Sequence, residues 1–101
     1  MMRFARNVQF TIRNGKQQEF KKVFETKALP VLQKQKGFED ELVMIHGDQG
    51  IAISLWNDRS SAESYAKSGY PQVLEALGPV VEGTPEVQLC EVPFTTLHAA
   101  V

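Results

Sequence analysis

An alternating run of apolar residues passes directly into a helical pattern over residues 50–65, near the middle of the chain. The alternation over 51–56 predicts a strand that ends on Trp56, the only tryptophan. Asn57 or Asp58 is then expected to cap a helix. Because a strand, a helix and a strand are predicted before this point and a helix and a strand after it, the chain is expected to run βαββαβ.

The flanking segments supply the other elements of this order. Alternation predicts strands over 4–12 and 86–92, and a continuous apolar run predicts a strand over 38–46 that is covered on both faces. Apolar residues at steps of three and four predict a helix over 20–35. Pro30 lies inside that helix and should bend it, because proline has no amide hydrogen to donate.

Glycine and proline mark the joints between these elements. Gly37 is expected to close the first helix in a left-handed conformation, and the turn over 47–50 is too short for anything but a hairpin. Residues 68–71 read Ser-Gly-Tyr-Pro, which divides the second helical region into two pieces. The second piece is expected to carry apolar residues from Val73 to Val81.

Length and charge limit the number of domains in the chain and the kinds of partner it can bind. Its 101 residues, 43% of them hydrophobic, fit one domain over 1–101, with a core over 4–92 and a tail over 93–101. The 11 basic and 12 acidic residues, with a net charge of −1, are spread along the whole chain, so no basic face is expected, and neither nucleic acid nor membrane is expected as a partner. No apolar run approaches the ~20 residues that span a bilayer, and we expect a cytoplasmic protein. Cys90, the single cysteine, is interpreted as a buried inert thiol.

The predicted fold leaves one face of a four-stranded antiparallel sheet open, because both helical regions pack on the other face. The patterns over 42–45 and 51–56 place apolar or small side chains on that open face in either register. Such a face exceeds the few hundred Å² that soluble monomers usually expose. We therefore expect a homodimer that buries sheet against sheet, with the tail over 93–101 at its seam. The alternative is a monomer whose tail covers the open face.

Several short segments, in order and at matching spacing, resemble one known family. They are Val8-x-Phe10-x-Ile12-x-x-Gly15, Gly37-Phe38, Ile53-Ser-Leu-Trp56-Asn-Asp58, Ser68-Gly-Tyr70-Pro-Gln-Val-Leu-Glu-Ala-Leu77 and Pro85-Glu-Val-Gln-Leu-Cys-Glu-Val92. Over residues 6–92 the chain resembles the antibiotic biosynthesis monooxygenase (ABM) family of the dimeric α+β barrel superfamily. The resemblance implies ferredoxin-like protomers paired through their sheets, with a small-molecule pocket between sheet and helices.

The family includes oxygenases of polycyclic aromatic phenols that use neither metal nor flavin, haem-degrading and quinol monooxygenases, and proteins of no known activity. The resemblance therefore implies a small-molecule monooxygenase that acts on an aromatic or quinol-type substrate with no cofactor and no metal. The alternatives are a non-catalytic domain that binds a small ligand or is related to stress, and an isomerase or decarboxylase of the same superfamily. Fold alone does not choose among these functions.

Haem degradation is disfavoured by the residues at the corresponding positions. The haem-degrading branch uses an Asn on the first strand, where this chain has Val8, and a His iron ligand near the position of Glu75. Asn7 is one residue away, and an offset of one residue places its side chain on the other face of the sheet. Without the imidazole, no neutral nitrogen is available to hold the iron.

A cofactor-free oxygenase needs a dry apolar pocket with a base or hydrogen-bond donors for a phenolate. Trp56, Tyr65 and Tyr70 are predicted to bind the substrate. Tyr65 and His46 are the candidate catalytic residues, and His46 suits a base because imidazole titrates near neutral pH. The simpler interpretation is that the three rings only pack and that His46 is solvated. The acidic residues 39–41 are interpreted as a solvated edge.

Overall fold

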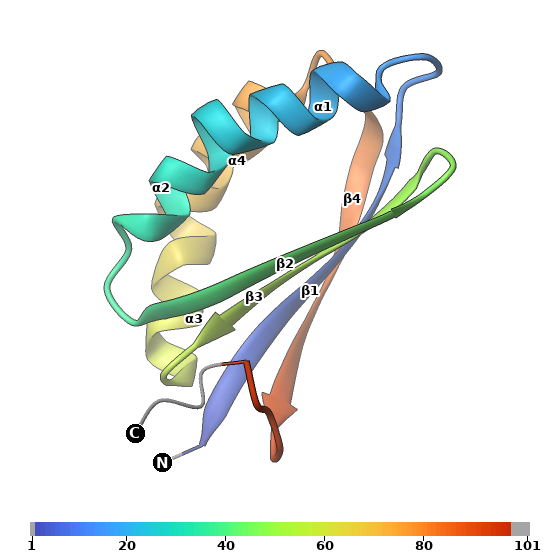
Figure 1. The fold of residues 1–101 in the computed structure, drawn as a ribbon. Helices are drawn as coiled ribbons and strands as arrows, with labels where there is room; N and C mark the ends of the chain where they lie inside the picture. The colour runs from blue at the N-terminus through green and yellow to red at the C-terminus, as the bar shows by residue number, and fades with distance from the viewer. Residues whose placement is uncertain (1, 98–101) are drawn as a thin grey trace.

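The computed structural model describes residues 2–97 and has the predicted α+β architecture. The elements are β1 (Arg3–Ile12), α1 (Gln17–Val23), a π-helical turn (Phe24–Ala28), α2 (Leu29–Gln33), β2 (Phe38–His46), β3 (Gln49–Trp56), α3 (Arg59–Lys67), α4 (Gly69–Leu77) and β4 (Val81–Val92). The strands form one antiparallel sheet in the order β2-β3-β1-β4, and the helices cover one face of it (Figure 1). Within the described residues, no helix has the length and apolar character needed to cross a membrane.

The strand register decides which side chains face the helices. Val8 on β1 pairs with Ala52 on β3, which pairs with Val43 on β2, and these side chains pack with the core beneath the helices. Alternation then places the odd-numbered residues of β3 on the open face. The helices therefore cover the small and aromatic side chains of β3, and the open face receives Ile51, Ile53 and Leu55.

The open face is partly apolar in the single chain. Leu42 and Met44 on β2 are 38% and 46% exposed there, and the carboxamide oxygen of Asn7 is buried without a hydrogen-bond partner among residues 2–97. The tail does not cover this face with its aromatic ring, because Phe94 is 90% exposed. The rest of the expected tail, after Leu97, lies outside the described residues. Pairing with a second copy through this face stays a prediction.

β4 begins earlier than the sequence pattern predicts. The helical piece that was expected to reach Val81 ends at Leu77, and Val81 already belongs to β4. The strand continues through Gly83, which has a φ of 68°, and the register with β1 shifts at this end of the strand. β4 is an edge strand, so Pro85 is tolerated within it although it cannot donate to a ladder.

The first helical run is bent one turn before Pro30, as expected, but through a π-helical turn. The amide of Leu29 donates to the carbonyl of Phe24, five residues back. Pro30 has no amide hydrogen to continue the regular ladder, and it lies in the first turn of α2, where the loss costs least.

Asp58 rather than Asn57 caps α3, since its Oδ1 accepts a hydrogen bond of 2.8 Å from the amide of Ser61. That bond lowers the pKa of the Asp58 carboxyl. Asn57 has a different role. Its backbone N–H donates a 2.9 Å hydrogen bond to the carbonyl of Gly37, which connects the start of β2 to the end of β3.

Replacing Gly37 by alanine is expected to lower the free energy of unfolding by roughly 2–4 kcal/mol. Gly37 has a φ of 84°, and a Cβ there would overlap the Ser61 side chain and lie 2.7 Å from Asn57 Oδ1. Gly15 is the matched control, because its φ is 75° but no atom lies within 4 Å of the added Cβ, so Gly15→Ala should cost only about 1 kcal/mol. Urea denaturation measures both values, and equal losses would contradict the packing argument.

Candidate functional site

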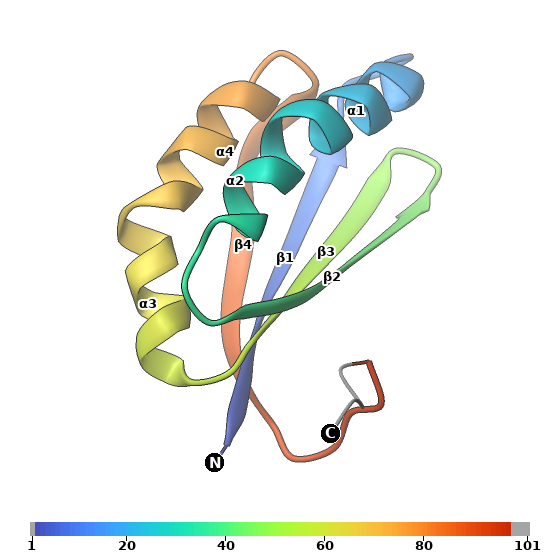
Figure 2. The same cartoon turned by 60° about the vertical axis from the view of Figure 1, so that its left-hand side comes forward.

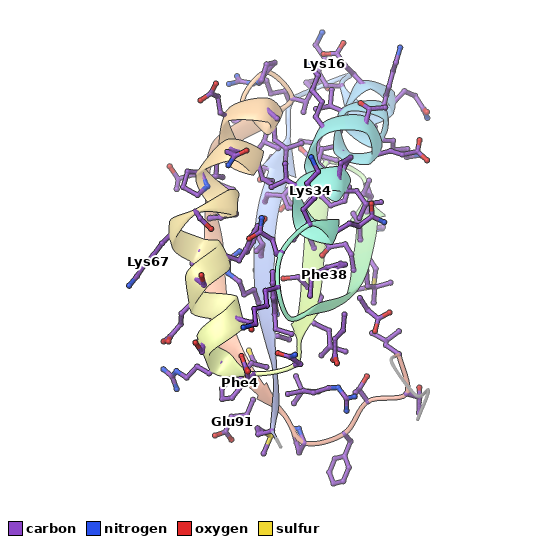
Figure 3. All side chains as sticks on the ribbon, turned by 90° about the vertical axis from the view of Figure 1, so that its left-hand side faces the viewer. Phe4, Lys16, Lys34, Phe38, Lys67 and Glu91 are labelled. Atoms are coloured by element: carbon purple, nitrogen blue, oxygen red, sulfur yellow. The ribbon has the colours of Figure 1, made fainter. Side chains whose placement is uncertain are left out.

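A cavity lies between the sheet and the helices, in the layer that Figure 3 shows filled with side chains from both sides. Its volume is about 70 Å³. The labelled Lys67, in contrast, points outward from α3 (Figure 3). The polar side chains that line the cavity come from three neighbouring strands and from the α3–α4 joint, and all other lining side chains are apolar. The polar set comprises Arg6, Glu41, Ser54, Tyr65 and Tyr70.

Three of these polar residues form a row across the sheet. Arg6 on β1 pairs with Ser54 on β3, and Ser54 pairs with Glu41 on β2, so all three side chains point toward the helices. Arg6 is 5% exposed and Ser54 is 4% exposed. Burial of a charged side chain costs free energy unless the charge is paired or has a function, so the row is a polar departure from the otherwise apolar side chains around it.

The aromatic residues of the second helical region cover the Arg6 end of this row. The guanidinium carbon of Arg6 lies 4.1 Å from the ring centroid of Tyr70 and 5.0 Å from that of Tyr65, distances at which a cation is attracted to the ring face. Tyr65 in turn stacks on Trp56 with ring centroids 5.0 Å apart. The indole Nε1 of Trp56 donates a 2.8 Å hydrogen bond to Ser54 Oγ. Because Ser54 belongs to the polar row, the aromatic side chains contact this row at both Arg6 and Ser54.

Burial dominates the electrostatics of the site. It raises the pKa of the Glu41 carboxyl to about 8, although the positive charge of Arg6 acts in the opposite direction. Glu41 Oε1 is buried and has no hydrogen-bond partner within residues 2–97. Burial also raises the pKa values of Tyr65 and Tyr70, so both phenols stay protonated at neutral pH. The cavity therefore holds one fixed positive charge beside a carboxyl group that can take up or release a proton.

The structure brings some of the predicted site residues together and separates one. Tyr65 and Tyr70 line the cavity, while Trp56 is fully buried behind Tyr65 and does not line it. His46 is exposed at the end of β2, where it pairs with Gln49 on the open face, away from the cavity. Cys90 pairs with Ala5 on the same open face and is half-buried.

The sequence interpretation missed the polar row, and for Glu41 it was wrong. The acidic segment was read as a solvated edge, but an irregularity between Phe38 and Asp40 sets the register so that Glu41 points into the cavity. Glu39 instead forms a 2.7 Å ion pair with Arg3 across β3. The sequence did contain a signal. Arg6 and Glu41 alternate in phase with apolar residues of their strands, which places them on the buried face, where a charged side chain does not contribute to solubility.

The described residues contain no group of three or more His, Cys, Asp or Glu side chains that could hold a metal ion. The structure also places the residues that stand at the positions named above for the haem-degrading branch. Val8 lines the cavity, Asn7 lies on the opposite face of the sheet and Glu75 is exposed.

No protein-family model matches the sequence, and no curated protein does. Solved structures match over nearly the whole chain. SnoaB from Streptomyces nogalater, described as a cofactor-independent oxygenase, has a TM-score of 0.74 and 21% identity over 94% of this chain and 97% of its own. A candidate antibiotic biosynthesis monooxygenase from Bordetella bronchiseptica has a TM-score of 0.79 and 9% identity over 93% of this chain and 100% of its own. The chain has the fold of the antibiotic biosynthesis monooxygenases.

This ABM fold confirms the resemblance at the level of architecture. It also occurs in NE2512 of Nitrosomonas europaea, described as a protein of unknown function, with a TM-score of 0.78 and 12% identity over 94% of this chain and 93% of that one. Because identities this low carry the fold and not the chemistry, the activity has to be argued from the polar row and the cavity.

Proposed function

We propose that this ABM-like chain oxidises an electron-rich hydroxyaromatic or quinol-type small molecule with O2, without metal or flavin. The observation that carries the proposal is the buried polar row, in which Arg6 and Glu41 face one apolar cavity from neighbouring parts of the sheet. A phenol transfers an electron to O2 far more readily after it loses its proton. The protein's part is therefore to remove that proton and to stabilise the resulting anion in a dry site.

Each member of the site has a defined part in this scheme. The guanidinium of Arg6 stabilises the phenolate, because a fixed positive charge acts strongly where water is excluded. Glu41, with a pKa of about 8, takes the phenolic proton when it is ionised and can return a proton later. The rings of Tyr65 and Tyr70 shield Arg6 from solvent. The reaction needs no external reductant, because a phenol and O2 become a quinone and water.

Oxygen uptake tests the proposal directly. The protein is mixed with 1-naphthol in buffer containing a metal chelator, and O2 consumption and quinone formation are followed together. We expect one O2 consumed per quinone formed, and oxygen from isotopically labelled O2 in the product. Uptake no faster than in protein-free buffer would contradict the proposal, and so would product that carries oxygen from water alone.

A second candidate function is supported by the size of the cavity. About 70 Å³ is well below the ~300 Å³ at which small-molecule pockets usually begin, so this volume favours binding of a small ligand without turnover. The same residues would serve, with Arg6 holding an anionic or phenolic group. Saturable binding of 1-naphthol without oxygen uptake would select this function over oxygenation.

A further inference from the structure

The two charged ends of the polar row do not contact each other. Arg6 on β1 and Glu41 on β2 lie on either side of Ser54 on β3, and Figure 2 shows these three strands side by side. Two strand spacings place their Cα atoms about 10 Å apart. Within residues 2–97 no ion pair joins the two side chains, and Glu41 Oε1 has no hydrogen-bond partner. The part of the cavity between them, the Arg6–Glu41 gap, therefore has a buried polar group on each side.

At neutral pH both sides of the Arg6–Glu41 gap can donate a hydrogen bond. Burial raises the pKa of the Glu41 carboxyl to about 8, so the group keeps its proton and its O–H can donate. Arg6 stays charged and carries five N–H donors, more than the hydroxyl oxygen of Tyr70 can accept. The other ionisable groups that line the cavity are the phenols of Tyr65 on α3 and Tyr70 on α4, and none of the lining residues from β3, β4 or the first helical run is ionisable. The gap therefore favours an acceptor with one negative charge.

We infer that the Arg6–Glu41 gap binds the carboxylate of a small organic acid. One carboxylate oxygen accepts from Arg6 and the other from protonated Glu41, and the negative charge balances the guanidinium. Apart from the polar row and the two tyrosines, the lining side chains are apolar, which suits a short hydrocarbon chain rather than an inorganic anion. The volume of about 70 Å³ limits the ligand to a few heavy atoms. Such binding uses the same cavity as the proposed reaction, but it needs no turnover.

The indole N–H of Trp56 reports on the gap, because it belongs to the only tryptophan and donates to Ser54. Its NMR signal is followed at pH 6.5 and constant ionic strength during titration with sodium butyrate and with butyramide, which has nearly the same shape but no charge. We expect a saturable shift with butyrate and a dissociation constant at least about tenfold higher for butyramide. Equal affinities, or no indole shift with butyrate, would overturn the inference.

The pH dependence of binding tests the part of Glu41. Because only the protonated carboxyl donates, butyrate affinity should fall about tenfold from pH 6.5 to pH 9, while butyrate itself stays ionised and the NMR spectrum shows that the chain stays folded. Glu41→Gln keeps an amide donor but does not titrate, so its affinity should not change with pH. Glu39→Gln is the matched control, because Glu39 pairs with Arg3, and it should keep the fall. The same butyrate affinity at both pH values in the parent chain would overturn the inference.

Replacement of Arg6 tests the other side of the gap. Arg6→Met removes the charge and should weaken butyrate binding at least about tenfold while it changes butyramide binding by less than about twofold. Arg6→Lys keeps the charge without the planar fork and should give a smaller loss of the same sign. Unchanged butyrate affinity in Arg6→Met would overturn the inference, and if that variant does not fold, the comparisons in the parent chain still decide.

The carboxylate site and the proposed oxygenation can fail separately. Butyrate binding by a chain that takes up no O2 with 1-naphthol would uphold the carboxylate site and contradict the oxygenation. Oxygen uptake by a chain that does not bind butyrate would overturn the carboxylate site alone.

Discussion

Replacing Glu41 by glutamine is expected to lower kcat/KM for hydroxyaromatic oxidation by roughly 10²- to 10⁴-fold, the usual contribution of a positioned general base. The amide keeps the shape and burial of the side chain but cannot take a proton. In the parent chain, kcat/KM should rise with pH, reach half of its maximum near pH 8, where half of the Glu41 carboxyls are ionised, and level off at higher pH. Oxygen uptake measured across this pH range should show the rise in the parent and a flat profile in Glu41→Gln.

Glu39→Gln is the matched control for this experiment. It makes the same chemical change on the same strand, but Glu39 pairs with Arg3 across β3 and does not line the cavity. Its pH profile should match that of the parent. Tyr70→Phe removes a hydroxyl beside Arg6 and keeps the ring, so it separates an effect of hydrogen bonding from an effect of the carboxyl. A full rate in Glu41→Gln would remove Glu41 from the reaction.

Titration of Glu41 is expected to make the free energy of unfolding depend on pH. Between pH 4.5 and about 8, the folded chain keeps the Glu41 proton while the unfolded chain releases it. The folded state binds more protons in this window, so the free energy of unfolding falls as the pH rises. The contribution of Glu41 is fully present below pH 4.5 and is lost as the pH passes through about 8, a loss on the order of 5 kcal/mol.

Glu41→Gln isolates this contribution from the titration of other groups. Urea denaturation of the two chains at a series of pH values gives the difference in their free energies of unfolding. That difference should grow in favour of the variant from pH 4.5 upward and become constant above about 8. A difference that does not change with pH would show that the carboxyl titrates normally in the folded state.

The carboxyl of Glu41 is expected to cost stability while it contributes to the proposed reaction. A loss on the order of 5 kcal/mol is comparable to the whole stability of many small domains, which is about 5–15 kcal/mol. A glutamine or an apolar residue at position 41 would avoid that cost. On the proposed function, the carboxyl near the buried charge of Arg6 is kept for its chemistry at the expense of stability, as functional sites commonly do.

Local patterns were sufficient for most of the architecture. The alternation over 51–56 predicted β3 because neighbouring side chains of a strand point to opposite faces, whatever the rest of the chain does. Gly37 and Asp58 marked the ends of helices through backbone and side-chain geometry that involves only a few residues. Tyr65 was predicted to face inward from its helical spacing and Tyr70 was chosen for its place at the joint between the two helical pieces, and both side chains line the cavity.

Local patterns failed where a feature depends on distant partners. The start of β4 was misplaced because Val81 fits a helix by spacing, and only its pairing with Ile12 makes it a strand residue. An interruption at Pro30 was expected, but its form, a π-helical turn, was not, because the apolar spacing of the run fits a regular α-helix equally well.

The sequence by itself determined the order of elements, the turns and the ring-bearing face of the second helical region, because each follows from interactions among neighbours along the chain. Tertiary structure alone decided the candidate site. Arg6, Ser54 and Glu41 are far apart in sequence, and they become adjacent only through the pairing of three strands in one register. A shift of that register by one residue would turn each side chain to the other face of the sheet, and the charge, the carboxyl and the cavity would no longer meet.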